Sequence, residues 1–276
     1  MSTTSGNIIW EKVFEGSPRK IITDKDNNIL LTNNKAIQKI NSNGSLIWEN
    51  EYEEFGIGMF KDIEKGVITD DDNNIYLAGS SGRGIPVYKF NSQGIEQWSK
   101  KIDRPEWTYG GVSIVVDNID GSIYVGGGSG MSEEKPRDGG EYDFIKLDNH
   151  GNIIWEKQEH TDYYMGVVTY TVIDTNTDVY TNLNKSITKF SSDGLEQWNN
   201  RIIVNGVIEM INDNNNNLYV IDYISREEYK LIKYNSDGKE KWVKKFNALD
   251  YYSTLFLDSK NNIYITSENI LIKISK

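Results

Sequence analysis

The sequence predicts an all-β fold, a closed six-bladed β-propeller whose blades are four-stranded antiparallel sheets. One three-part motif recurs six times along the 276 residues. Segments of β-branched and aromatic residues alternate with Asn-, Asp- and Gly-rich turns, and helical periodicity is absent. The spacing of the motif is preserved across the two chain ends, which predicts a ring. A unit of about 46 residues is also the length expected for one propeller blade.

The motif predicts the four strands, A to D, of each blade. In the second copy an apolar stretch ends before Asp70, and an Asn- and Asp-rich turn leads into a short apolar strand. Asn, Asp and Gly tolerate left-handed backbone angles and cap their own turns, so this part predicts the A-to-B hairpin. Lys89 precedes an apolar residue in strand C, which predicts a solvated or ion-paired face. Gly94 and Trp98 predict the turn into strand D, where the indole fills the wedge between blades.

The tryptophan spacing predicts that the ring closes through the chain ends. The motif tryptophans are Trp10, Trp48, Trp98, Trp155, Trp198 and Trp242. Their intervals are 38, 50, 57, 43 and 44 residues, and the interval from the last to the first across the chain ends is also 44. We therefore expect 271–276 and 6–14 to supply the third and fourth strands of the last blade, whereas an open solenoid would need capping repeats. The blades of this single domain, 1–276, are expected at about 18–52, 58–102, 108–158, 165–202, 205–246, and 250–276 with 5–14.

Two known repeats are similar to this motif. The third copy, with IVVDNIDGSIYVGG from Ile114 and GGEYDFIKLDNHGNIIW from Gly139, resembles the bacterial SBBP-type β-propeller repeat. The Gly-x-x-x-Trp element is similar to that of quinoprotein-like propellers. That second family implies a quinone cofactor only where vicinal cysteines and a metal-binding core accompany the blades. The sequence contains no cysteine, so we expect no cofactor.

Composition limits the possible partners. The net charge of -11 and the pI near 4.8 oppose binding to nucleic acid or to anionic membranes. No apolar run approaches the roughly 20 residues that cross a bilayer, and the polar start does not resemble a signal peptide. We expect a monomer without membrane insertion, cytoplasmic as given or extracellular if a leader was removed. The absence of cysteine removes disulfides and thiolate sites but leaves the compartment open.

The Asp-x-x-Asn-Asn turns also suggest a metal site. Carboxylate and amide oxygens are ligands that Ca²⁺ prefers, and the most acidic turn would offer Asp70, Asp72 and Asn74. No turn continues as an EF-hand loop, and the same residues are those that a tight hairpin requires. Turn formation is therefore the favoured interpretation, and calcium binding is the alternative.

Little in the sequence predicts catalysis. His150 lies in a tight Asn-His-Gly turn, and His160 is expected in a connection between blades. Zinc sites usually need several histidines or cysteines, and the spacing assembles no Ser-His-acid triad. An exposed histidine without a catalytic role is therefore the favoured interpretation of His160, and Glu159 and His160 are the candidate acid-base pair if the protein is an enzyme.

The two faces of the predicted ring differ in their loops. The A-to-B and C-to-D turns share one face, the turn face, and are short and uniform. The B-to-C and D-to-A connections share the other, the variable face, and differ in length. Because loops on a rigid scaffold often carry recognition, the variable face is the predicted binding face. Its candidate residues are Tyr52, Phe55, Arg83, Arg104, Trp107, Tyr109, Arg137, Tyr163, Tyr164, Tyr223, Arg226, Tyr251 and Tyr252.

These aromatic and charged side chains suit a protein or a glycan partner. For most of the aromatic ones, packing against neighbouring blades is the favoured interpretation. The sequence therefore predicts a recognition or scaffold propeller that is not an enzyme. Two alternatives stay open: a lyase or hydrolase with its site near the central axis, and the structural cell-surface repeat that the SBBP resemblance partly implies.

Overall fold

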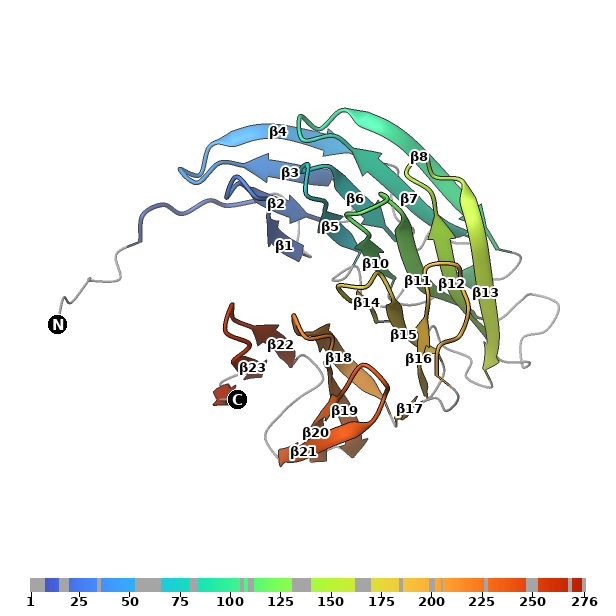
Figure 1. Cartoon of the computed structure of the whole chain (residues 1–276). Helices are drawn as coiled ribbons and strands as arrows, with labels where there is room; N and C mark the ends of the chain where they lie inside the picture. The colour runs from blue at the N-terminus through green and yellow to red at the C-terminus, as the bar shows by residue number, and fades with distance from the viewer. Residues whose placement is uncertain are drawn as a thin grey trace.

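The chain folds into six β-sheets arranged radially around a central axis (Figure 1). The computed structural model describes residues 8–14, 20–33, 36–52, 66–79, 84–104, 107–108, 112–130, 140–161, 170–183, 186–198, 202–204, 206–225, 228–246, 253–267 and 270–274. Within these ranges the sheets are antiparallel and consecutive strands pair, which confirms the predicted all-β six-bladed propeller. Among the described residues, no helix has the length and apolar composition needed to span a membrane.

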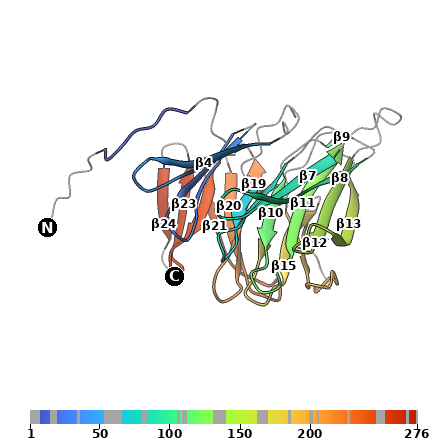
Figure 2. The ribbon, with the colours of Figure 1, turned by 90° about the horizontal axis from the view of Figure 1, so that it is seen from above.

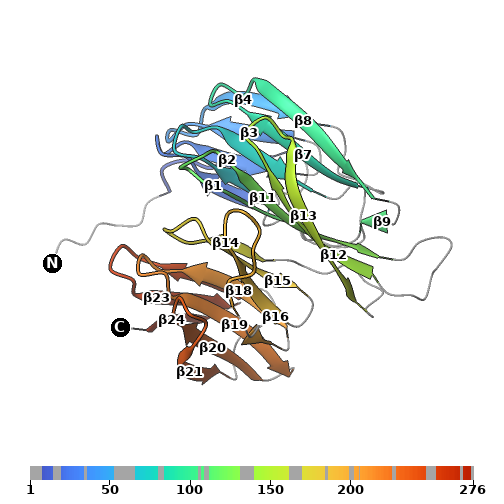
Figure 3. The same ribbon diagram turned by 45° about the vertical axis from the view of Figure 1, so that its right-hand side comes forward.

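Each blade uses consecutive strands, A to D from the axis outward. Blade 1 contains β1 (Lys20–Thr23), β2 (Ile29–Thr32), β3 (Ala36–Ile40) and β4 (Leu46–Glu51), and blade 2 contains β5 (Val67–Thr69), β6 (Ile75–Ala78), β7 (Gly84–Phe90) and β8 (Glu96–Asp103). Blade 3 contains β10 (Ser113–Val116), β11 (Ile123–Gly130), β12 (Gly140–Leu147) and β13 (Ile153–Thr161), and β9 (Trp107–Thr108) pairs with β11. Figure 3 shows the long strands of this blade.

The other three blades follow the same order. Blade 4 contains β14 (Thr171–Ile173), β15 (Val179–Leu183), β16 (Ser186–Phe190) and β17 (Ile202–Ile203), and blade 5 contains β18 (Val207–Asn212), β19 (Leu218–Ser225), β20 (Glu228–Tyr234) and β21 (Glu240–Phe246). Blade 6 contains β22 (Thr254–Leu257), β23 (Ile263–Ser267) and β24 (Ile270–Ile274). The innermost strands contact one another in the order β1, β5, β10, β14, β18, β22, so the blades follow the chain around the axis.

The A-to-B turns have the structure that their sequence predicts. In blade 2 the Asp70 Oδ1 accepts hydrogen bonds from the backbone nitrogens of Asp72 and Asn74, at 3.0 and 2.8 Å. Asn73, between them, has a φ of 62°, the left-handed region that Asn tolerates better than most residues. Aspartates at the same position bond two turn amides in blades 1, 4, 5 and 6 as well. The turn interpretation of this motif therefore explains its recurrence.

A repeated contact, here called the blade latch, joins adjacent blades. The Lys39 Nζ and the Trp48 Nε1 of blade 1 both donate hydrogen bonds to the Ser92 carbonyl oxygen of blade 2, at 3.0 and 3.3 Å. Lys39 and Trp48 face each other in the register of β3 and β4, so both reach one acceptor. The next three latches use the carbonyl oxygens of Asn149, Ser192 and Ser236. The recurring lysine and tryptophan thus join each of blades 1 to 4 to the blade that follows it.

Three of the four latch lysines, Lys39, Lys146 and Lys189, are buried and ion-paired, and Lys89 is half-buried. The Lys39 Nζ lies 2.8 Å from the Asp24 Oδ2, and both side chains are almost fully buried. In blade 4 the Lys189 Nζ lies 3.3 Å from the Asp174 Oδ2 and 5.0 Å from the centre of the Tyr180 ring. The Tyr180 hydroxyl donates to the same carboxylate oxygen at 2.9 Å. The turn aspartate therefore compensates the buried ammonium, as a buried charge requires.

Blade 6 departs from the prediction, because it has three strands among the described residues. Residues 8–14, which were expected to form its fourth strand, adopt no strand and run away from β24 (Figures 1 and 2). The Trp10 Nε1 nevertheless donates to the Ser42 carbonyl oxygen of blade 1 at 2.9 Å, the tryptophan half of a blade latch. Ile8, Ile9 and Val13 are exposed. Trp10 thus anchors this segment to blade 1, and little apolar burial draws it onto blade 6.

The interface between blades 6 and 1 is correspondingly open. Ile21 of β1 is 62% exposed, whereas the residues at its position in the other blades, among them Val67, Ile114 and Leu255, are at most 8% exposed. Phe256 of β22 is 60% exposed. These apolar side chains would be covered if blade 6 packed against blade 1 as the other blades pack.

Candidate functional site

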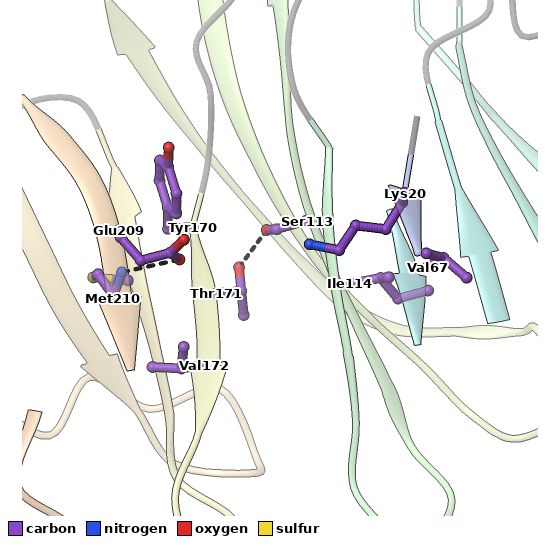
Figure 4. Close-up of a pocket in the computed structure, with 9 residues that line it drawn as sticks. All are labelled: Lys20, Val67, Ser113, Ile114, Tyr170, Thr171, Val172, Glu209 and Met210. Atoms are coloured by element: carbon purple, nitrogen blue, oxygen red, sulfur yellow. Dashed lines mark hydrogen bonds between the residues drawn. The ribbon is translucent and has the colours of Figure 1, made fainter. Parts of the chain in front are cut away.

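A cavity of about 180 Å³ lies on the central axis, between the innermost strands of blades 1 to 5 (Figure 4). It is lined by Lys20, Val67, Ser113, Ile114, Tyr170, Thr171, Val172, Glu209 and Met210. Several of these are the first residues of their strands, namely Lys20, Val67, Ser113 and Thr171. Each innermost strand starts where the D-to-A connection ends, so the cavity lies at the variable-face end of the axis.

One position around this cavity differs in every blade. Each innermost strand is followed by its turn aspartate: Asp24, Asp70, Asp117, Asp174, Asp213 and Asp258. Four residues before the aspartate lie Lys20, Gly66, Ser113, Tyr170, Glu209 and Thr254, which we call the mouth ring. The next position along is Ile21, Val67, Ile114, Thr171, Met210 and Leu255, apolar in all blades but one. Among the six blades, the position that follows the mouth ring is therefore similar, whereas the mouth ring itself varies.

Hydroxyl groups connect blades 3 and 4 beside the cavity. The Ser113 Oγ donates to the Thr171 Oγ1 at 2.8 Å, and the Thr171 Oγ1 lies 3.3 Å from the Thr181 Oγ1. The Tyr170 backbone nitrogen donates to the Asn182 Oδ1, which fixes the start of β14. These bonds hold the polar part of the cavity wall in place, as a preformed site requires.

One cationic side chain, Lys20, and one anionic side chain, Glu209, also line the cavity. Lys20 is half-buried, and its ammonium makes no hydrogen bond or ion pair with the residues that the structure describes. The Glu209 Oε1 accepts a hydrogen bond from the Met210 backbone nitrogen at 3.3 Å. In Figure 4 the Lys20 and Glu209 side chains extend from opposite sides toward the Ser113 and Thr171 pair.

Two predicted binding residues lie in the interior. Tyr52 is 9% exposed, and its hydroxyl donates to the Ala36 carbonyl oxygen at 3.1 Å. Burial raises the pKa of the Tyr52 phenol well above its usual value. The Arg104 Nε donates to the Asp143 Oδ1 at 3.0 Å, and both side chains are buried. Burial raises the pKa of the Asp143 carboxyl, and Arg104 opposes that effect. Both residues have structural partners here.

The other candidates of the variable face are only partly visible. Tyr223 is half-buried and lies edge-on to Tyr229, with ring centres 5.5 Å apart. Trp107 begins β9, opposite Gly130, and its side chain is not described. The remaining candidates lie outside the described residues: Phe55, Arg83, Tyr109, Arg137, Tyr163, Tyr164, Arg226, Tyr251 and Tyr252. A role for these in binding stays a prediction.

Glu159 and His160 lie near the end of β13 instead of in a connection between blades. The His160 Nδ1 is 3.2 Å from the Glu141 Oε1, and the His160 side chain is 56% exposed. Successive residues of a strand point to opposite faces, so β13 does not bring the Glu159 and His160 side chains together. Their contact with one substrate is therefore not supported by this arrangement.

The acidic turn considered for calcium is filled by its own hydrogen bonds. Besides the two backbone donors, the Asp70 Oδ2 accepts from the Asn74 Nδ2 at 2.8 Å and from the Tyr76 hydroxyl at 2.9 Å. Among the described residues, no group of three His, Cys, Asp or Glu side chains is arranged to hold a metal ion. Calcium binding by Asp70, Asp72 and Asn74 would have to displace these donors, and it stays an untested alternative.

Comparison with known proteins shows similarity in fold alone. No family model matches the chain, and no curated protein sequence matches it, so the SBBP resemblance stays a prediction. The Pan2 WD40 domain of Neurospora crassa is 11% identical, with a TM-score of 0.58, covering 91% of this chain and 76% of that one. BBS1N, solved in complex with ARL6DN, has the same identity and TM-score, covering 93% and 76%.

A bacterial extracellular domain is similar to the same degree. This domain of a putative one-component system from B. thetaiotaomicron is 11% identical, with a TM-score of 0.58. The match covers 96% of this chain and 35% of that one. Because the identity is so low, these matches concern the fold alone. They establish that the chain has the architecture of bacterial and eukaryotic β-propellers.

Proposed function

We propose that this protein is a recognition propeller that binds a protein partner through its variable face and catalyses no reaction. The supporting observation is the contrast between the two faces. On the turn face, the C-to-D turns carry the carbonyl oxygens of the blade latches, so their sequence is constrained by the fold. On the variable face, the mouth ring differs in every blade. Residues released from a structural constraint on a rigid scaffold are where recognition evolves.

A neighbouring fold supports the class of partner. BBS1N was solved in complex with ARL6DN, so one propeller similar to this chain binds a protein. The aromatic and basic residues predicted on the variable face are the types that concentrate binding energy in protein interfaces.

Site-specific photo-cross-linking tests this proposal. A photoreactive amino acid is placed on the variable face at Ser225 or His160, and on the turn face at Asn43 or Gln93, all of them exposed. We expect one protein from a lysate of the source organism to cross-link reproducibly to the first pair and not to the second. Equal labelling from both faces, or labelling from Asn43 and Gln93 alone, would contradict the proposal. A glycan array bound by the unmodified chain, with no protein captured, would assign the face to glycans instead.

A further inference from the structure

We propose that the axial cavity is a binding site for a small monocarboxylate, an organic acid with one carboxylate group and a short apolar chain. The proposal goes beyond the protein partner of the variable face, because it concerns a small molecule held between the innermost strands. It rests on a half-buried ammonium group, on the apolar wall of the cavity and on the size of the cavity.

Lys20 supplies the charge that a ligand would meet. Its side chain is half-buried and extends into the cavity, and its ammonium has no hydrogen-bond or ion-pair partner among the described residues (Figure 4). The latch lysine Lys39, in contrast, is buried 2.8 Å from the Asp24 carboxylate. Withdrawing an ammonium group from water costs free energy unless an anion compensates it. A carboxylate is the complementary group, since it accepts charge-assisted hydrogen bonds from an ammonium.

The Glu209 carboxylate lines the same cavity and already has partners of its own. Its Oε1 accepts a hydrogen bond from the Met210 backbone nitrogen at 3.3 Å, and this bond is not its only interaction. The ligand therefore needs no contact with Glu209. The negative charge of Glu209 would repel a second negative charge on the ligand, so the cavity favours a monoanion over a dianion.

The wall and the size of the cavity suit a short apolar chain. Apolar surface beside the Lys20 ammonium comes from Val67, Ile114, Val172 and Met210. An apolar cavity of about 150 Å³ is large enough to bind benzene. The axial cavity has a volume of about 180 Å³, so a monocarboxylate of about four to six carbons fits it. Burial of that chain favours binding, and acetate would largely lack this contribution.

The other blades show that the fold does not require a lysine at this position. The residue that corresponds to Lys20 is Gly, Ser, Tyr, Glu or Thr in blades 2 to 6. The latch lysine, in contrast, recurs in all six copies of the motif, and in blades 1 to 4 it bonds to the next blade. Lys20 makes no such contact among the described residues, so a ligand carboxylate would be the first group to compensate its charge.

Isothermal titration calorimetry on the full chain tests the proposal. The probes are butyrate, isovalerate and hexanoate. Each is compared with its neutral amide, which keeps the chain and lacks the charge, and with the straight-chain dicarboxylate of the same carbon number. We expect at least one monocarboxylate to bind with a stoichiometry of one and a Kd below about 1 mM. Its amide, the dicarboxylate and acetate should each bind at least about tenfold more weakly.

Two lysine variants locate the site. Lys20→Met removes the ammonium in the cavity and should weaken binding of the best probe by about tenfold or more. Lys25→Met removes an exposed lysine that pairs with Asp71, and it should leave the Kd unchanged. Circular dichroism should show both variants folded. In the wild type, the best probe should also slow the acetylation of Lys20 by an amine-reactive reagent, measured by mass spectrometry, and leave that of Lys25 unchanged.

Three results would overturn the proposal. It is wrong if no monocarboxylate binds, or if the neutral amide or the dicarboxylate binds as tightly as the acid. It is also wrong if the best probe neither loses affinity for Lys20→Met nor protects Lys20 from acetylation. Because the capture of a protein partner is measured separately by photo-cross-linking, either proposal can fail while the other stands.

Discussion

Replacing Gly94 by alanine should destabilise the propeller through two separate effects. Gly94 has a φ of 80°, and an alanine in this left-handed region costs about 1 to 2 kcal/mol. A Cβ at Gly94 would also lie 2.7 Å from the Trp48 Cδ2, closer than van der Waals contact allows. The Trp48 ring cannot retreat freely, because its Nε1 donates to the Ser92 carbonyl oxygen at 3.3 Å, and losing that bond costs about 1 kcal/mol. The expected total is about 2 to 3 kcal/mol.

A double-mutant cycle in urea separates these effects. Unfolding is followed by far-UV circular dichroism for the wild type, Gly94→Ala, Trp48→Leu and the double variant. An equal m-value in all four proteins would show that they unfold in the same transition. In the Trp48→Leu background Gly94→Ala should cost only the backbone term of about 1 to 2 kcal/mol, so the two changes should couple by about 1 kcal/mol or more. A loss below about 0.5 kcal/mol for Gly94→Ala, or an equal loss in both backgrounds, would refute the role of the latch.

Three further perturbations test the fold. Arg104→Met should lower the free energy of unfolding in urea by about 3 to 5 kcal/mol, since it leaves the fully buried Asp143 without its cation. A loss as small as that measured for exposed ion pairs would contradict the burial of this pair. The pKa of Asp258 is lowered from 3.8 to about 2, first by its hydrogen bond from the Asn262 side chain, so its contribution to stability should be complete above pH 4 and disappear as the pH falls toward 2. An NMR titration showing an unshifted Asp258 would remove this effect. The double variant Lys12→Cys/Leu271→Cys tests whether residues 8–14 can pair with β24 in the register of β3 and β4. If they pair, oxidation should form a disulfide within one chain. A disulfide between two chains would indicate strand exchange, and the absence of any disulfide would support three strands in blade 6.

Much of the fold could be predicted from sequence because the repeat encodes local and neighbouring contacts together. The turn aspartates cap their own turns, and the Gly and Trp of the third motif element meet across one blade interface. A single copy of the motif would have left the fold ambiguous, whereas six copies with circular spacing predict a propeller. Strand order and the blade count therefore followed from spacing alone.

The candidate site was harder to predict, because its residues are the ones that do not repeat. Residue type suggested surface binding for Tyr52 and Arg104. In the structure, however, Tyr52 bonds to a backbone carbonyl oxygen within blade 1, and Arg104 pairs with Asp143 of blade 3. The mouth ring could have been found from sequence by aligning the six copies on the turn aspartate and asking which strand position diverges. That comparison shows Lys20 and Glu209 as the two charged residues at this position, but only the structure places both around one cavity.

In blade 6 the spacing of the repeat is not sufficient to predict the strands. Every latch needs two blades, and the sixth needs groups from both ends of the chain. Trp10 already makes the tryptophan half of that latch on Ser42, whereas β24, which carries Lys273, lacks an outer strand among the described residues. Joining the chain ends has a larger entropic cost than closing a hairpin within one blade, because the loop to be closed is far longer. The interface with the weakest local encoding is therefore the one left open, and the exposed Ile21 and Phe256 mark the apolar surface that closure would bury.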